Sequence, residues 1–232
     1  MPVVTIAREY GAGGSAVAML LAEELGATIL DRSLIAEVAR RASLRDDQVV
    51  AEDEHARPWL DLLSGAFIPL GETVGGWAAN PDGFPDHHAR IVAFTQAVLH
   101  EAARSGNAII VGRGGAVALR DRESACHVFL WAPEADRVRT IRERLGCDAN
   151  LARRAMHRVD ARRAAYVREV YRVDWRDRAL YDLILNTGRL GHAGAAAAIL
   201  GALRGRRGDP FEERPAGLDP PGANPRTAPR QR

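Results

Sequence analysis

The sequence predicts an α/β protein with a parallel β-sheet that is covered by helices on both faces. Short apolar runs without polar alternation recur along the chain, and such runs are typical of strands buried on both faces of a parallel sheet. Each run is followed by a loop and then by a segment with helical spacing of its apolar residues. The length of 232 residues fits one such domain with a full core, whereas two compact domains would be cramped. The five predicted strands cover residues 3–6, 28–30, 108–111, 126–130 and 183–186.

Local signals support the predicted helices. Gly26 suits the end of the first helix, over residues 16–25, because glycine accepts the left-handed conformation that ends many helices. Pro133 suits a first turn and Asp148 suits an N-cap, so each of them begins a further helix. The helices predicted after the first cover residues 34–42, 43–55, 88–104, a short stretch ending near 120, 133–145, 149–171 and 192–203.

Two stretches lack the periodicity of a helix or a strand. Residues 58–85 scatter aromatic residues among glycines and prolines, which indicates either a loop with packed aromatics or a flap that moves. Residues 204–232 contain six of the twelve prolines and carry seven arginines against four acidic residues. We therefore predict one folded domain over residues 1–203 and a disordered tail over residues 204–232.

Composition argues against several classes of function. The net charge of +2 indicates neither a nucleic-acid partner nor an anionic membrane surface. No apolar run approaches the roughly 20 residues that a membrane-spanning helix needs, and the N-terminus lacks the pattern of a signal peptide. Cys126 and Cys147 have neither metal-binding nor redox spacing, which suits a reducing compartment. We expect a cytoplasmic protein, and the sequence does not indicate its oligomeric state.

A glycine-rich turn between the first strand and the first helix indicates a phosphate-binding site. The backbone N–H groups of such a turn and the N-terminus of the helix attract an anion. The standard phosphate-binding loop, or P-loop, reads G-x-x-x-x-G-K-[ST]. When Gly13 and Ser15 are aligned to that pattern, Arg8 stands at the first glycine and Gly14 stands at the lysine. The alternative is a tight turn that only packs the strand against the helix.

The cation that the loop lacks must come from an arginine, because all 32 basic residues are arginine. Arg8 is the nearest, and it either replaces the lysine or pairs with Glu9 or another acid. Asp31, Arg32 and Arg113 follow two other predicted strands, at the edge where parallel sheets bind their ligands. Arg113 either holds a phosphate by two hydrogen bonds or is an exposed residue at the end of a strand. Asp31 could instead cap the next helix.

Arginines also gather on the predicted helix over residues 149–172. Arg154, Arg158 and Arg162 repeat at intervals of four, so like charges stack on one face. Such stacking is mildly destabilising unless an anion binds there, and the alternative is a solvated face in a protein without lysine. The arginines of this helix are Arg153, Arg154, Arg158, Arg162, Arg163 and Arg168.

Six blocks of sequence, in this order along the chain, resemble the cytidylate-kinase-like P-loop proteins. Together they span residues 3 to about 190, while residues 45–90 match poorly and the tail does not match. The family's loop also begins with an arginine, which Arg8 retains. The blocks are IAREYGAGG at 6–14, DRxLI at 31–35, IIVGR at 109–113, FLxAP at 129–133, DxxRxxY at 160–166 with Trp175, and YDLILNT at 181–187.

This resemblance implies a three-layer P-loop NTPase fold with a five-stranded parallel sheet and a helical, arginine-rich lid at about residues 149–172. It also implies ATP and Mg²⁺, with Ser15 as a ligand of the metal. The loop residues that would bind the phosphates of ATP are Gly11, Ala12, Gly13, Gly14 and Ser15.

The resemblance further assigns roles outside the loop. Asp31, Arg32 and Arg113 would bind the acceptor nucleotide. Arg8, Arg158 and Arg163 would be catalytic, because guanidinium groups stabilise the charge that develops on a transferred phosphoryl group.

We therefore predict an ATP-dependent phosphotransferase that moves the γ-phosphoryl group to a nucleoside monophosphate. The resemblance alone indicates CMP or dCMP as the acceptor. One alternative is a regulatory module that binds a nucleotide with little or no turnover, because Gly14 replaces the lysine. Another is a nucleic-acid binder that uses the basic helix and the tail, which Asp160, Glu169 and Asp174 argue against because they interrupt the positive charge.

Overall fold

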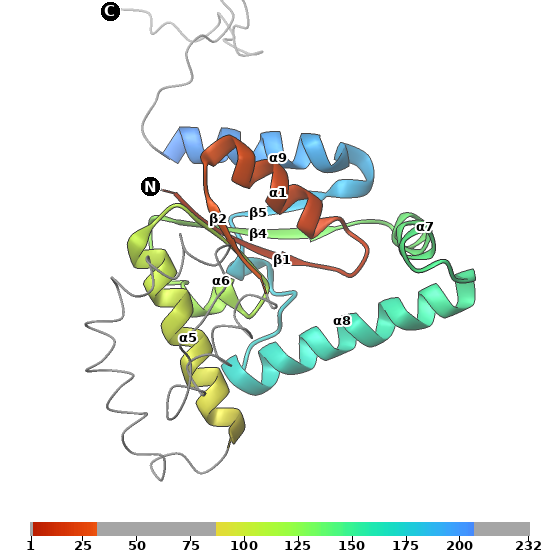
Figure 1. Cartoon of the computed structure of the whole chain (residues 1–232), viewed down its shortest axis with the longest axis horizontal. Helices are drawn as coiled ribbons and strands as arrows, with labels where there is room; N and C mark the ends of the chain where they lie inside the picture. Colours follow the sequence, from red (N-terminus) through yellow and green to blue (C-terminus); the bar gives the residue numbers. More distant parts are fainter. Residues whose placement is uncertain (1, 32–86, 207–232) are drawn as a thin grey trace, which may run out of the picture.

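The computed structural model describes residues 2–31 and 87–206, in which five strands form one parallel sheet (Figure 1). The strands lie in the order β2-β3-β1-β4-β5. Their bounds are β1 Val3–Arg8, β2 Thr28–Leu30, β3 Ala108–Val111, β4 Ala125–Trp131 and β5 Leu183–Asn186. The predicted five-stranded parallel sheet is thereby confirmed.

The register of the strands brings the polar segments to one edge of the sheet. Ile6 of β1 lies beside Val111 of β3, so the chain that follows each of them leaves the sheet at the same level. On the other side, Arg8 pairs with Leu130 of β4, whose next residue pairs with Asn186 of β5. The glycine-rich loop therefore shares the carboxyl edge with the segments that follow β3 and β5.

Helices cover both faces of the sheet, as Figure 1 shows. Helices α1 (Gly14–Leu25) and α9 (Thr187–Arg206) cover one face, and they bury Val4 and Ile6 of β1 beneath them. Helices α5 (His87–Ser105) and α6 (Gly115–Ala118) cover the other face, where Val3 is buried. Both faces of β1 are therefore buried, which explains the apolar run without alternation.

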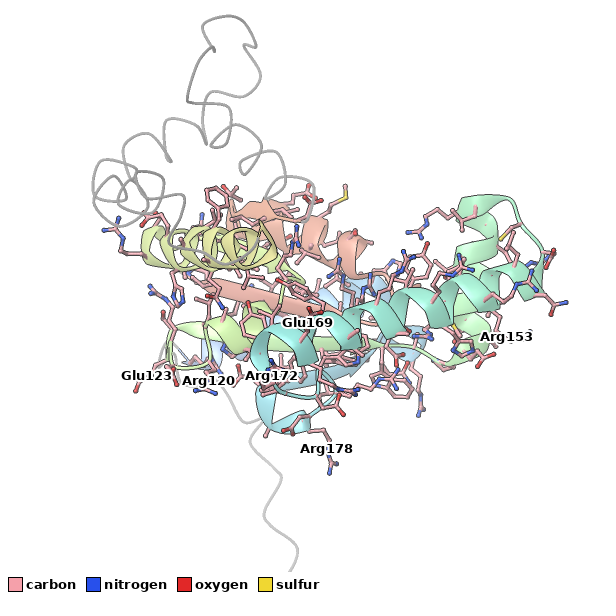
Figure 2. The ribbon with its side chains drawn as sticks, turned by 90° about the horizontal axis from the view of Figure 1, so that it is seen from below. Arg120, Glu123, Arg153, Glu169, Arg172 and Arg178 are labelled. Carbon is pink, nitrogen blue, oxygen red and sulfur yellow. The ribbon has the colours of Figure 1, made fainter. Side chains whose placement is uncertain are left out.

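Helices α7 (Glu134–Leu145) and α8 (Ala149–Tyr171) follow β4 and pack against each other. Asp148 caps α8 as predicted, because its side chain accepts a hydrogen bond from the N–H of Leu151 at 2.9 Å. Figure 2 shows α8 with Arg153 near one end and with Glu169 and Arg172 near the other. Arg153 lies beside α7, where its Nε donates to Glu134 at 2.6 Å.

The last helix differs from the prediction at both ends. It begins at Thr187 instead of 192 and continues through Arg206 instead of ending at 203. Gly191 interrupts it with a φ of 67° and a ψ of 174°, so two helical pieces meet at a kink. A short 3₁₀ helix, Arg178–Leu180, was also not predicted.

Several predictions concern residues outside the described part of the chain. They include Arg32, the helices over residues 34–55, the irregular segment 58–85 and the tail from residue 207. Within residues 2–31 and 87–206, no helix is long and apolar enough to cross a membrane. The cytoplasmic location stays a prediction.

Candidate functional site

The glycine-rich loop joins β1 to α1 and leaves the N-terminus of α1 open. Gly13 caps the helix in a left-handed conformation with a φ of 74° and supplies no side-chain acceptor. The first turn of α1 contains no acidic residue, and Ser15 in that turn is exposed. The first N–H groups of a helix lack partners within the helix, so this turn can receive an anion.

Neighbouring side chains require glycine at three positions of this loop. A Cβ at Gly11, whose φ is 86°, would lie 2.9 Å from the carbonyl oxygen of Arg137. A Cβ at Gly13 would overlap the imidazole of His192, which lies just after the kink of α9. A Cβ at Gly14 would lie 2.7 Å from Cγ of Arg8. Contacts with Arg137, His192 and Arg8 therefore account for glycine at these three positions.

Arg8 occupies the space where the side chain of a P-loop lysine would begin. Its aliphatic stem passes over Gly14, and its guanidinium reaches Gly112 at the end of β3. Burial and the neighbouring Arg163 lower the pKa of Arg8 to about 10, against the attraction of Asp31. The alternative partner Glu9 is instead bound by Arg137 at 2.9 Å and by Arg176 at 3.1 Å.

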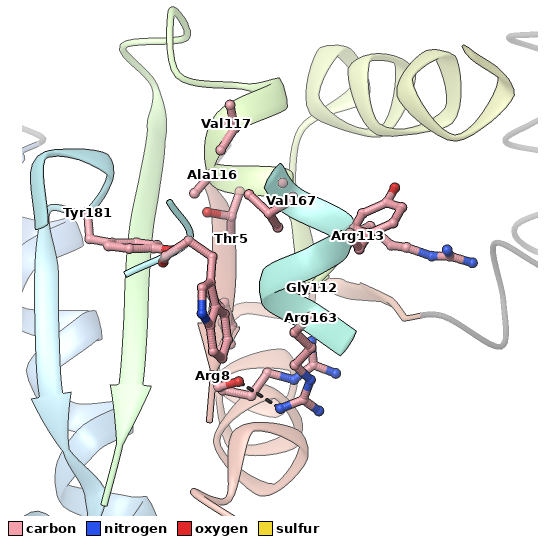
Figure 3. A pocket seen from close by; sticks show the side chains of 15 residues that line it. Thr5, Arg8, Gly112, Arg113, Ala116, Val117, Arg163, Val167 and Tyr181 are labelled. Atoms are coloured by element: carbon pink, nitrogen blue, oxygen red, sulfur yellow. Dashed lines mark hydrogen bonds between the residues drawn. The ribbon is translucent and has the colours of Figure 1, made fainter. Parts of the chain in front are cut away.

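Arg163 of α8 meets Arg8 at the same end of the site. Its Nη1 donates to the carbonyl oxygen of Arg8 at 2.7 Å, as the dashed line in Figure 3 indicates. Burial lowers the pKa of Arg163 too, although Asp160 attracts its charge. Two guanidinium groups that remain charged at neutral pH are thus held together in a partly buried site. An anion placed between them would relieve their repulsion.

The two arginines line a cavity that is partly open to solvent. Its polar side includes Arg8, Arg163 and the loop after β3, and its other walls are apolar or aromatic (Figure 3). Trp175 is buried in one wall and packs edge-to-face on Phe129, with ring centroids 5.5 Å apart. The cavity thus combines concentrated positive charge with a rigid apolar wall.

Arg113 follows β3 and lines the same cavity, but its side chain extends away from Arg8 and Arg163 in Figure 3. Its Nε is buried and has no hydrogen-bond partner among the described residues. Its φ of 58° is strained for a residue with a side chain, and Tyr171 donates to its carbonyl oxygen at 3.2 Å. The strain and the unused donor are what a binding residue would show.

Asp31 and Arg158 were also predicted as site residues. Asp31 is exposed at the end of β2, close enough to attract the charge of Arg8. Arg158 is exposed on α8 and stands two residues from the buried Asp160. Two residues correspond to about 200° around a helix, so Arg158 points away from the side that meets the loop. The structure therefore brings Arg163, and not Arg158, to Arg8.

Two side chains that hold the loop were not assigned to the site by the sequence analysis. Arg137 of α7 is buried between Glu9 and Asp160, with its Nη1 at 2.9 Å and 2.7 Å from their carboxylate oxygens. Thr187 donates to the carbonyl oxygen of Ala12 at 3.0 Å. A signal for Arg137 exists, because it stands at helical spacing with the buried Val138 and Ile141. Thr187 comes directly after the last predicted strand, at the sheet edge where ligands bind, and it ends the block YDLILNT.

Known proteins resemble this chain both in sequence and in fold. Residues 3–189 match the protein family described as the cytidylate kinase-like family. A solved structure of an uncharacterized protein from Eubacterium ventriosum is 23% identical, with 88% of this chain and 98% of that chain covered and a TM-score of 0.64. At this identity, the likeness shows the fold alone.

Two enzymes of known name give weaker structural matches. A shikimate kinase from Bacteroides thetaiotaomicron is 15% identical over 88% of this chain and 97% of that chain, with a TM-score of 0.44. A gluconokinase from Sinorhizobium meliloti is 14% identical over 87% and 91%, with a TM-score of 0.43. No curated protein matches the chain.

Proposed function

The chain belongs to the cytidylate kinase-like family, and on that premise we propose that it transfers the γ-phosphoryl group of ATP to a nucleoside monophosphate. CMP and dCMP are the proposed acceptors, and this preference comes from the family alone. The observation that carries the proposal is the pairing of Arg8 with Arg163 beside an open P-loop. This pairing provides the positive charge that Gly14 cannot provide.

The proposed chemistry depends on position and charge, because phosphoryl transfer requires little covalent work from the protein. The backbone of Gly11, Ala12, Gly13 and Gly14 would hold the phosphates of ATP, because no capping side chain of Gly13 and no acidic residue occupies the first turn of α1. The exposed hydroxyl of Ser15 would hold Mg²⁺, which when bound neutralises charge on the phosphate oxygens.

The arginines are proposed to act on the phosphoryl group itself. Arg8 and Arg163 stabilise the charge on the group in transit, within the cavity that they line. Arg113, Asp31 and Arg32 bind the acceptor. A catalytic role for Arg158 would require α8 to expose its other face to the cavity, so we restrict the proposal to Arg163.

The test is an ADP-release assay over a panel of ribo- and deoxynucleoside monophosphates, with a reaction lacking acceptor as the control. We expect ADP release to depend on the acceptor, and to be fastest with a cytidine monophosphate. Binding of ATP measured by calorimetry, without ADP release from any acceptor, would support the regulatory module in its place. Equal release with and without acceptor would indicate hydrolysis instead of transfer.

Replacement of Arg113 by alanine should weaken the use of the acceptor. Loss of a charged hydrogen-bond donor to a phosphate costs about 1.5 to 3 kcal/mol, so we expect kcat/KM for the acceptor to fall by about 10- to 100-fold. The KM for ATP should stay within about threefold, because Arg113 is not part of the loop. Arg120→Ala is the matched control, since Arg120 is an exposed arginine on the same connection. Equal kinetics in the two variants would remove Arg113 from the site.

Replacement of Ser15 by alanine should change the dependence of the rate on Mg²⁺. Loss of one hydroxyl ligand is expected to raise the Mg²⁺ concentration for half-maximal rate by about tenfold. The exposed Ser124 offers a control substitution outside the loop. A Mg²⁺ titration that superimposes on that of the unaltered protein would contradict this role for Ser15.

A further inference from the structure

A buried cluster of three charges joins the P-loop to α8 outside the cavity. Nη1 of Arg137 lies 2.7 Å from Oδ2 of Asp160 and 2.9 Å from Oε2 of Glu9. The side chains of Arg137 and Asp160 are only 6% and 8% exposed, and that of Glu9 is 16% exposed. Among the described residues, those that line the cavity do not include these three. They therefore contact one another, the loop, Arg163 and Arg176, and they do not face the contents of the cavity.

Asp160 contacts Arg137 and also two other parts of the site. Its Oδ1 accepts a hydrogen bond from the backbone N–H of Tyr10, in the P-loop, at 2.8 Å. The same oxygen lies 3.6 Å from Nη1 of Arg163, one helical turn further along α8. Nη1 of Arg163 in turn donates to the carbonyl oxygen of Arg8. One carboxylate thus fixes the backbone of the loop and orients the arginine that meets it.

The ring of Tyr10 adds a second restraint on Arg163. The guanidinium of Arg163 lies 5.7 Å from the centre of this ring, and that of Arg144 lies 4.8 Å from it. Arg163 is thus held by a carboxylate, by a backbone carbonyl and by an aromatic ring.

Stability alone does not account for the buried cluster. Removing charges from water is costly, and well-packed apolar side chains at such positions are often equally stable or more stable. An apolar cluster, however, could not accept the N–H of Tyr10 or direct the guanidinium of Arg163. The geometry therefore favours a role in orientation.

We propose that Arg137 and Asp160 are positioning residues, which hold Arg163 against the P-loop before the substrates bind. Neither residue lines the cavity, and both act through Arg163 and through the backbone at Tyr10. The kinetic consequence rests on the proposed phosphoryl transfer, whereas the orientation of Arg163 does not. An arginine oriented in advance loses less freedom in the transition state, so its displacement lowers kcat more than it changes ground-state binding.

The kinetic test compares Arg137→Met with Arg139→Met. Both arginines are on α7, but Arg139 is exposed and, in the part of the chain that the structure describes, pairs with Asp136 of its own helix at 2.6 Å. We expect Arg137→Met to lower kcat by about 100-fold while both KM values stay within about threefold. Arg139→Met should match the unaltered protein. A folded Arg137→Met protein with normal kcat would overturn the proposal. So would a fall in kcat that is fully explained by the fraction of unfolded protein, measured by circular dichroism.

A second variant keeps the test valid if Arg137→Met does not fold. Arg137→Lys retains the positive charge between Glu9 and Asp160 but replaces the planar guanidinium with a single ammonium group. We expect it to fold, with kcat lowered by about tenfold and KM values near normal. Normal kcat in Arg137→Lys would overturn the proposal.

A spectroscopic measurement separates this proposal from the proposed function. In protein labelled with ¹⁵N-arginine, the guanidinium signals of Arg163, assigned by their loss in Arg163→Lys, report its restricted rotation. We expect slow rotation in the unaltered protein and in Arg139→Met, and fast rotation in Arg137→Met or Arg137→Lys. Unchanged rotation would overturn the positioning role. The result does not depend on turnover, so it stands even if no monophosphate accepts a phosphoryl group.

Discussion

Exchanging the residues at positions 8 and 14 should restore much of the phosphoryl transfer that the loss of Arg8 removes. We expect Arg8→Gly to lower kcat by about 10³-fold or more, because the loop then has no cation of its own. Gly14→Lys alone should also be impaired, since its Cβ would lie 2.7 Å from Cγ of Arg8. The double variant R8G/G14K removes that overlap and recreates G-x-x-x-x-G-K-S, so its kcat should exceed that of either single variant by at least about tenfold.

The outcome is a test of whether Arg8 stands in for the lysine. The measurement is kcat for ATP with the best acceptor, in all four proteins of the cycle. If the double variant is no faster than Arg8→Gly, the arginine does not replace the lysine. If Gly14→Lys alone is as fast as the unaltered protein, the steric argument fails.

A stability measurement on Arg8→Met controls for damage to the fold. Burial and Arg163 lower the pKa of Arg8 from the ordinary value of an arginine to about 10, so folding disfavours its charge. This cost is fully present below pH 10 and declines as the pH rises above 10 toward the ordinary pKa of an arginine. Arg8→Met should therefore raise the free energy of unfolding at pH 7, by about 1 to 3 kcal/mol in urea melts, while activity is lost. A lower stability would indicate that Arg8 serves the fold.

Replacement of Arg163 should have the second largest effect. Arg163→Ala removes one of the two guanidinium groups at the P-loop and the hydrogen bond to the carbonyl of Arg8. An arginine that stabilises a transferred phosphoryl group contributes about 10³- to 10⁵-fold in rate, and we expect a loss of kcat in this range. Binding of ATP, measured by calorimetry without acceptor, should weaken far less than kcat falls.

Two further substitutions make the result at Arg163 specific. Arg163→Lys keeps the positive charge but lacks the planar set of donors of a guanidinium. Its kcat should therefore exceed that of Arg163→Ala by about tenfold and no more. Arg158→Ala gives the comparison within α8. A loss at Arg158 equal to that at Arg163 would show that α8 turns its outer face inward during turnover, and would contradict the arrangement described above.

Much of the fold was predictable because it depends on local pattern. Val3, Val4 and Ile6 lie between two layers of helices, and burial on both faces requires an apolar run without alternation. Gly26 and Asp148 end and begin helices through their own backbone and side-chain geometry. The glycine-rich loop was recognisable for the same reason, since its position between a strand and a helix is a local feature.

The partners of individual charges were less predictable, because they come from distant parts of the chain. The sequence left Arg8 between a catalytic role and an ion pair with Glu9. In the structure Glu9 forms an ion pair with Arg137, which stands 128 positions later in the sequence. The guanidinium of Arg137 also forms an ion pair with Asp160. The resemblance assigned a catalytic role to both Arg158 and Arg163, and the face of α8 that packs on the loop separates them.

The sequence by itself therefore determined the sheet, its flanking helices, the glycine-rich loop and the absence of any lysine that could serve it. These features follow from periodicity, from turn chemistry and from a composition without lysine. Only the tertiary structure decided that the stem of Arg8 fills the space above Gly14 and that Arg163 donates to the carbonyl oxygen of Arg8. Such contacts depend on how elements pack in three dimensions, which no spacing along the chain specifies.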